Sequence, residues 1–84
     1  MAGLYYKGTF SNAKDCITTG VYYNYEGNAA GLPSEIGKQI MMVVITCPQL
    51  LIQEVTSYIT GRVYRRIVNL SQNDWSIWQR VDNV

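Results

Sequence analysis

The chain contains no histidine among its 84 residues. Histidine is the commonest general base and metal ligand in proteins, and its side chain titrates nearest to neutral pH. Without it, the plentiful serines and threonines cannot form an ordinary catalytic triad. The six acidic residues are scattered along the chain, and no pair of them suggests a glycosidase dyad. The sequence therefore predicts that the protein is not an enzyme, and it points to no metal and no cofactor.

Charge is also scarce, because seven basic and six acidic residues leave a formal net charge of +1. A protein that grips nucleic acid through its phosphates needs a basic field, which this chain lacks. The most apolar run, residues 40–52, is interrupted by Pro48 and is shorter than the ~20 residues that cross a bilayer. We therefore expect neither nucleic-acid binding nor membrane insertion.

Cysteine is limited to Cys16 and Cys47, which lie far apart in the chain and have no metal-binding spacing. A disulfide between them is one alternative. The N-terminal residues lack the pattern of a secretory signal peptide, which favours a reducing compartment. We therefore expect two buried free thiols rather than a disulfide.

Tyrosine, by contrast, is abundant and supplies seven of the ten aromatic residues. Its amphipathic ring suits half-buried sheet faces and interfaces. The length fits one domain, residues 1–84, with a thin stability margin, because so short a chain buries only about 60–65% of its unfolded surface. We expect residues 11–81 to form the core of this domain and residues 1–10 to form an edge strand or a linker.

Runs of β-branched and aromatic residues, separated by turn residues, predict a sheet of short strands. The expected strands are residues 21–25, 40–46, 50–56, 62–68 and 75–81. One short helix is expected over residues 11–16, capped by Ser11 or Asn12. The strand at residues 40–46 is apolar on both faces, so we expect it at the centre of the sheet, covered on both sides. The predicted fold is mainly β: a small antiparallel sheet of about five strands with one short N-terminal helix.

Two neighbouring arginines, Arg65 and Arg66, fall on opposite faces of the strand at residues 62–68, because side chains alternate along a strand. Such a pair could hold an anion. We favour the simpler interpretation, in which one arginine is stacked on an aromatic ring and the other is a solvated charge.

Two tryptophans, Trp75 and Trp78, lie on the last predicted strand, where their odd spacing puts them on opposite faces. A bulge between them would bring both rings to one side. The rings could stack on sugars or bases. A domain of this size, however, has few large side chains with which to fill its core. We therefore favour core packing for both tryptophans.

Three tyrosines occupy the strand at residues 21–25, where Tyr23 and Tyr25 share one face and Tyr22 takes the other. One of these faces is expected to belong to the core. For the other face, ordinary sheet packing is favoured over a ligand-binding or subunit surface. The candidate residues for such a surface are Tyr23, Tyr25, Tyr64 and Arg65.

Three stretches, taken in order, carry a resemblance to a known family. They are residues 16–23 (Cys-Ile-Thr-Thr-Gly-Val-Tyr-Tyr), Leu32-Pro33 followed by Gly37 and residues 40–45, and residues 63–66 followed by a turn and Trp75-x-x-Trp78. From about residue 12 to residue 81, the chain resembles the knob domain of R-type pyocin and phage tail fibres. The family's arginine matches Arg66, with Arg65 as the alternative. The matching positions, as fold determinants, are Gly20, Tyr22, Leu32, Pro33, Arg66, Trp75 and Trp78.

The resemblance implies a non-enzymatic module of a phage or prophage-like tail fibre, made in the bacterial cytoplasm and located in the virion tail. Such fibres are homotrimers that recognise bacterial surface polysaccharide, often lipopolysaccharide. The module would be structural, would contribute to this receptor binding, or both. The competing hypothesis is a stand-alone carbohydrate-binding module, in which Trp75 or Trp78 provides an exposed stacking platform.

Overall fold

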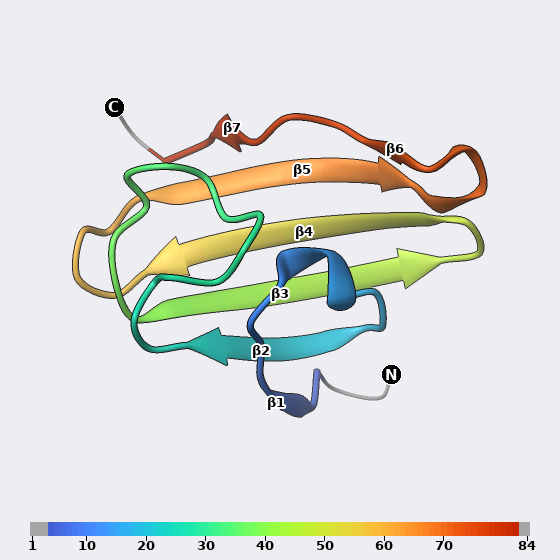
Figure 1. Ribbon diagram of the computed structural model, residues 1–84. Helices are drawn as coiled ribbons and strands as arrows, with labels where there is room; N and C mark the ends of the chain where they lie inside the picture. Colours follow the sequence, from blue (N-terminus) through green and yellow to red (C-terminus); the bar gives the residue numbers. More distant parts are fainter. Residues whose placement is uncertain (1–3, 83–84) are drawn as a thin grey trace.

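A computed structural model describes residues 4–82 as one curved sheet of seven strands (Figure 1). The strands are β1 (Tyr6–Thr9), β2 (Gly20–Asn24), β3 (Ile40–Cys47), β4 (Leu50–Ser57), β5 (Val63–Asn69), β6 (Asp74–Trp75) and β7 (Gln79–Arg80). They lie in the order β1-β2-β3-β4-β5-β6, and β7 also pairs with β5. From β2 onward every pairing is antiparallel. The prediction of a mainly β, largely antiparallel fold is confirmed, with two more short strands than expected.

The expected N-terminal helix is a single 3-10 turn, η1 (Ala13–Asp15). Asn12 caps it, because its side-chain oxygen accepts a hydrogen bond from the backbone N–H of Lys14 at 3.0 Å. A segment this short cannot offset the free-energy cost of nucleating an α-helix. It therefore forms only one capped turn. A second 3-10 turn, η2 (Leu70–Gln72), lies in the last predicted turn.

The N-terminal edge strand exists as β1, but it pairs with β2 in the parallel sense. Tyr6 lies opposite Val21, and Thr9 lies opposite Tyr23. A parallel neighbour needs a crossover connection, which the chain provides through η1. Residues 1–3, at the start of the predicted edge strand or linker, lie outside the described residues.

The last predicted strand is divided into β6 and β7, with residues 76–78 between them. At this interruption the Ser76 hydroxyl accepts a hydrogen bond from the Ile67 N–H at 3.2 Å and donates one to the Ile67 carbonyl at 2.6 Å. A side chain thus replaces strand pairing at this point of β5. The interruption brings Trp75 and Trp78 to the same side of the sheet, as expected for a bulge between them.

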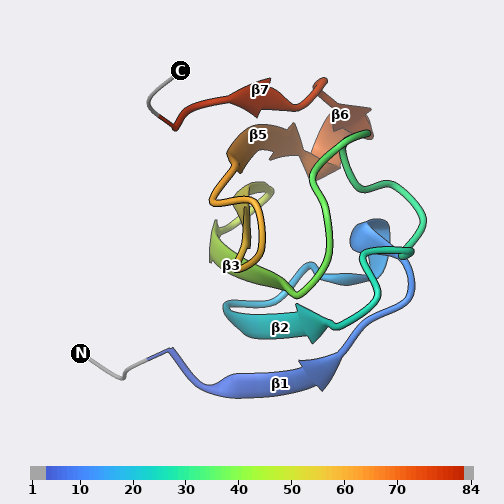
Figure 2. The ribbon, with the colours of Figure 1, turned by 90° about the vertical axis from the view of Figure 1, so that its left-hand side faces the viewer.

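The sheet has one face closed by the chain and one face open (Figure 2). Figure 2 shows the strands curving around an interior that η1 and the segment between β2 and β3 close on the other side. We call the closed side the inner face. Its core side chains include Tyr22, Ile40, Met42, Val44, Leu51, Val55 and Val68.

The opposite side of β2–β5, which we call the outer face, has no cover among the described residues. Met41 and Ile45 on the central strand β3 are 45% and 54% exposed, whereas Met42 and Val44 are fully buried. The expectation that this strand is covered on both sides is therefore wrong for the isolated chain. The connecting segments form only one layer, and that layer lies on the inner face.

Candidate functional site

Arg66 lies on the inner face of β5, 7% exposed and sandwiched between two indole rings. Its guanidinium carbon is 4.8 Å from the ring centre of Trp75 and 4.2 Å from that of Trp78. Both tryptophans are half-buried and pack against the core. Arg66 is thus the stacked cation of the arginine pair, and each indole ring already has one face occupied.

A buried amide connects Arg66 to the N-terminal turn. Gln53 is fully buried and accepts a hydrogen bond from the Arg66 Nε at 2.8 Å. The Gln53 Nε2 donates to the carbonyls of Ala13 at 2.7 Å and Cys16 at 2.9 Å. Within residues 4–82 the Arg66 Nη2 has no hydrogen-bond partner. Burial lowers the pKa of Arg66 to about 10, which leaves it charged at neutral pH.

The first stretch of the resemblance holds the β1–β2 edge together. A Cβ at Gly20 would come within 2.3 Å of the Lys7 side chain and 2.9 Å of the Tyr5 carbonyl, so the close approach of β1 requires glycine here. Tyr22 is buried, and its hydroxyl donates to the Thr18 carbonyl at 2.8 Å. Both residues therefore have packing roles.

The other two stretches meet at the inner face. The Trp78 Nε1 donates to the Gly31 carbonyl at 2.7 Å, which ties the last segment to the loop before β3. In that loop Leu32 packs against the core and Pro33 is buried. All seven positions named as fold determinants thus lie in or against the closed side of the sheet, away from the outer face.

The outer face carries a cleft at one end, with a volume of about 340 Å³. Its lining, which we call the tyrosine end, is Tyr23, Gln39, Met41, Thr56 and Tyr58. Tyr23 and Met41 are cross-strand partners, as are Met41 and Thr56. Tyr58 is 83% exposed, so its aromatic ring forms a solvent-accessible part of the rim of the cleft.

The backbone holds the tyrosine end in place. The Gln39 N–H donates to the Tyr25 carbonyl at 2.7 Å, and the Gln39 carbonyl accepts from the Tyr58 N–H at 3.0 Å. Gln39 has a φ of 54°, in the left-handed region that non-glycine residues rarely adopt. The Tyr25 ring lies edge-on to Tyr23 with centroids 6.4 Å apart. Tyr25 therefore extends the aromatic surface beyond the cleft.

The four candidate surface residues do not form one site. Tyr23 and Tyr25 belong to the tyrosine end, whereas Tyr64 is half-buried and packs against the core on the inner face. Arg65 is on the outer face, where its Nη2 is 2.8 Å from the Glu54 carboxylate. Strand alternation could have added Met41 and Thr56 to Tyr23, because they share its face, but Tyr58 lies in a turn and follows no such pattern.

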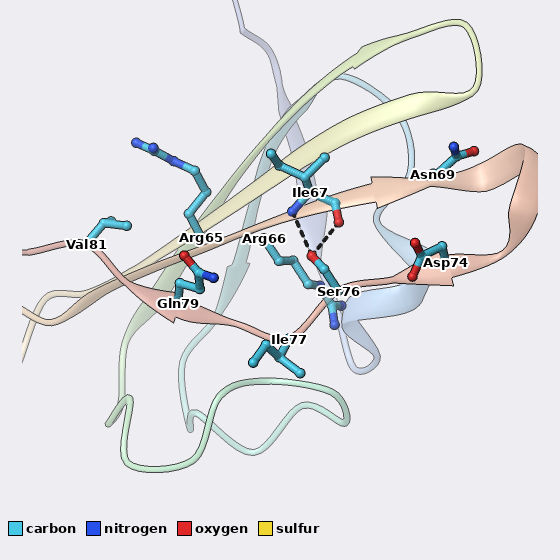
Figure 3. A pocket seen from close by; sticks show the side chains of 9 residues that line it. All are labelled: Arg65, Arg66, Ile67, Asn69, Asp74, Ser76, Ile77, Gln79 and Val81. Carbon is cyan, nitrogen blue, oxygen red and sulfur yellow. Dashed lines mark hydrogen bonds between the residues drawn. The ribbon is translucent and has the colours of Figure 1, made fainter.

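A groove of about 450 Å³ runs between β5 and the last segment (Figure 3). Figure 3 shows Ser76 reaching across to Ile67 in its middle, with Asn69 and Asp74 at one end and Arg65 and Gln79 at the other. This terminal groove has polar side chains at both ends, and Ile67, Ile77 and Val81 make much of its lining apolar. Its central hydroxyl is already bonded on both sides to β5, so the groove serves first to close the sheet edge.

The far end of the outer face is aliphatic and forms a shallow depression of about 240 Å³. We call it the isoleucine end, and its large exposed side chains are Ile45, Leu50, Ile52 and Ile67. Cys47 lies beside them and is exposed. Both cysteines are free as expected, but only Cys16 is buried, because β3 ends at Cys47 on the uncovered face.

Residues 4–82 contain no group of three or more histidine, cysteine, aspartate or glutamate residues that could hold a metal ion. In the same part of the chain, no helix is long and apolar enough to cross a membrane. A scan against protein-family models, a search of curated proteins and a search of solved structures each found no match. The interpretation of the site therefore depends on its geometry.

Proposed function

We propose that this chain is a non-enzymatic module of a phage or prophage-like tail fibre, located in the virion tail, that contacts a bacterial surface glycan. The observation that carries the proposal is the tyrosine end of the outer face. It joins the exposed ring of Tyr58, the half-buried ring of Tyr23, an amide and a hydroxyl in one open cleft. The resemblance of the three sequence stretches to tail-fibre knobs supports the same function, with the chain acting as part of a homotrimer.

The composition of the cleft suits a saccharide. Tyr23 and Tyr58 present apolar ring faces with a polar hydroxyl at the tip, which matches the mixed apolar and polar surface of a sugar ring. Gln39 offers both a donor and an acceptor, and Thr56 offers a hydroxyl. A few polar groups placed in an otherwise apolar concavity are typical of ligand sites. The openness of the rim fits a long polysaccharide that passes across the surface.

The competing module, which would stack sugar on Trp75 or Trp78, has less support. Both indole rings enclose Arg66, and the Trp78 Nε1 is bonded to the Gly31 carbonyl. A sugar would have to use the remaining half-buried face of either ring. Tryptophan emission tests this alternative, which predicts that an added polysaccharide shifts the emission to the blue and shields it from a soluble quencher.

The experiment is an isothermal titration calorimetry measurement, in which the folded chain is titrated with lipopolysaccharide and, separately, with the polysaccharide detached from it. Tyr58→Ala should weaken binding about tenfold, the effect of losing one well-placed aromatic contact. Tyr6→Ala is the matched control, because Tyr6 is 65% exposed but lies on the edge strand β1. Equal affinity for Tyr58→Ala and wild type, with saccharide bound by both, would reject the tyrosine end as the glycan site.

A further inference from the structure

The cleft at the tyrosine end has no charged side chain in its lining among residues 4–82. The charged residues on either side of it are joined to one another. Before β3 the Lys38 Nζ is 3.9 Å from the Glu26 carboxylate. In the next row of the outer face the Arg65 Nη2 is 2.8 Å from the Glu54 carboxylate. A charged ligand would thus lose hydration in this cleft without gaining a free counter-charge, so the cleft suits a neutral one.

Gln39 supplies a polar group that remains for a ligand. Its backbone N–H and carbonyl are already bonded within the chain, to the Tyr25 carbonyl at 2.7 Å and to the Tyr58 N–H at 3.0 Å. The donor and the acceptor that remain at this position are those of the side-chain amide. The two backbone bonds hold the residue in its left-handed conformation, with a φ of 54°. The amide is therefore presented to the cleft from a fixed backbone.

Met41 supplies an apolar surface in the same lining. It is 45% exposed and lies between its cross-strand partners Tyr23 and Thr56. Its unbranched thioether side chain adapts to small apolar groups and makes favourable contacts with aromatic rings. The cleft thus combines a hydrogen-bonding amide with an apolar side chain, beside the rings of Tyr23 and Tyr58.

We propose that the tyrosine end binds the acetamido group of a neutral N-acetylated amino sugar. This inference deepens the proposed function and rests on it, because it names the class of sugar that the glycan site takes. The acetamido N–H and carbonyl pair with the amide of Gln39, and the acetamido methyl group contacts Met41. The sugar ring packs on the exposed ring of Tyr58.

Simpler sugar substituents match only one of these two groups. A hydroxyl has no apolar part to bury against Met41, and the methyl group of a deoxy sugar would leave the Gln39 amide without a partner. The acetamido group satisfies both. The cleft volume of about 340 Å³ is near the lower end of the range for small-molecule sites, which fits one substituted ring of a longer glycan.

The test compares two disaccharides, with binding followed by amide chemical shifts. Diacetylchitobiose and cellobiose have the same ring stereochemistry and the same linkage, and each ring carries an acetamido group in the first where it carries a hydroxyl in the second. We expect diacetylchitobiose to shift the amides of Gln39, Met41 and Tyr58. It should bind about tenfold more tightly than cellobiose, because it adds one amide pairing and one methyl contact.

Gln39→Glu separates the amide from the rest of the cleft. The variant keeps an acceptor and the length of the side chain but removes the N–H donor, so it should lose most of the preference for diacetylchitobiose. Gln49→Glu is the matched control, because Gln49 also has a positive φ, of 73°, but lies in the turn between β3 and β4, beside the isoleucine end. This control makes the same charge change and should keep the wild-type preference.

Three outcomes would overturn the proposal. One is a wild-type chain that binds the two disaccharides equally or binds neither. Another is a preference for diacetylchitobiose whose shifts lie outside the tyrosine end. The third is a preference that Gln39→Glu retains in full. Binding of the whole polysaccharide, and its weakening by Tyr58→Ala, is measured separately, so the proposed function can stand where the acetamido assignment fails.

Discussion

The two faces of the sheet are built from alternate residues of the same strands, yet they distribute polarity in opposite ways. The inner face buries polar side chains, among them Gln53, which is fully buried, and Arg66. The outer face exposes apolar ones, such as Met41 and Ile45. In an isolated antiparallel sheet the open face is usually polar. The inner face is completed by the chain itself, whereas no residue of the described part of the chain covers the outer face, which is why we propose an external partner for it.

The largest expected effect is on the buried network of the inner face. Gln53→Leu would leave the Arg66 Nε and the Cys16 carbonyl without a partner, and the Ala13 carbonyl with only the Cys16 N–H. Unpaired buried polar groups, one of them charged, should lower the free energy of unfolding by about 3–5 kcal/mol. Urea denaturation measures this loss. The control is Glu54→Gln, because Glu54 is the next residue and faces solvent. This variant should change the free energy of unfolding by less than about 1 kcal/mol. Similar losses for both variants would contradict the contrast between the two faces.

Two adjacent methionines give the most direct comparison of the faces. Met42 is fully buried and Met41 is 45% exposed. Met42→Thr should cost about 2–4 kcal/mol, because it removes apolar volume from a packed core. Met41→Thr should stay within about 0.5 kcal/mol of wild type. Thermal unfolding at low protein concentration measures both values, and an equal cost would show that the outer face packs within the monomer.

The reactivity of the two thiols should also differ between the buried and the exposed side of the sheet. Burial, with a smaller contribution from Asp15, raises the pKa of the Cys16 thiol from 9.0 to about 11, whereas Cys47 is exposed. At pH 8 the Cys16 thiolate is therefore about 100-fold rarer than that of an ordinary cysteine. A thiol reagent should label one cysteine rapidly in the folded chain and two after denaturation. Equal labelling rates in the folded chain would contradict the burial of Cys16.

The raised pKa of Cys16 also predicts how the stability of the fold changes at alkaline pH. Because the folded pKa of Cys16 is raised, its contribution is fully present below pH 9.0 and is lost as the pH rises through about 11. Cys16→Ala should therefore flatten the decline of stability over this window. Thermal melts between pH 8 and pH 11 measure the slope.

The smallest effect concerns the sheet edge where the faces meet. Asp82 accepts hydrogen bonds from Arg80 at 2.9 Å and from the Val63 N–H at 3.0 Å, and these bonds lower its pKa from 3.8 to about 2. A lowered carboxyl pKa adds stability that is present above pH 3.8 and is lost as the pH falls through about 2. Asp82→Asn should thus destabilise the chain at pH 7 and much less at pH 2. Melting temperatures at the two pH values test this, and an equal difference at both would contradict it.

Strand alternation predicted much of the fold. The pattern over residues 62–68 placed Arg66 and Val68 on one face and Arg65 and Ile67 on the other, and the burial of these four side chains follows that division. Periodicity succeeds there because a strand has only two faces. It failed for β3, since a run that is apolar on both faces does not reveal whether the second cover comes from the same chain.

Other features depend on contacts that no local pattern encodes. The separation of β6 from β7 requires the Ser76 hydroxyl to bond the Ile67 backbone. The role of Gln53 depends on carbonyls nearly forty residues earlier in the chain. The tyrosine end likewise needed the turn that carries Tyr58 to fold back beside Gln39. Each of these contacts joins segments whose proximity exists only in the folded sheet.

The central claim is that the outer face is a contact surface, and amide chemical shifts during a titration with detached bacterial surface polysaccharide test it most directly. A saccharide bound at the tyrosine end should shift the amides around Tyr23, Met41 and Tyr58. Amides around the buried Gln53 and Val68 should stay fixed. Shifts confined to the inner face, or a spectrum that the added polysaccharide leaves unchanged, would contradict the claim.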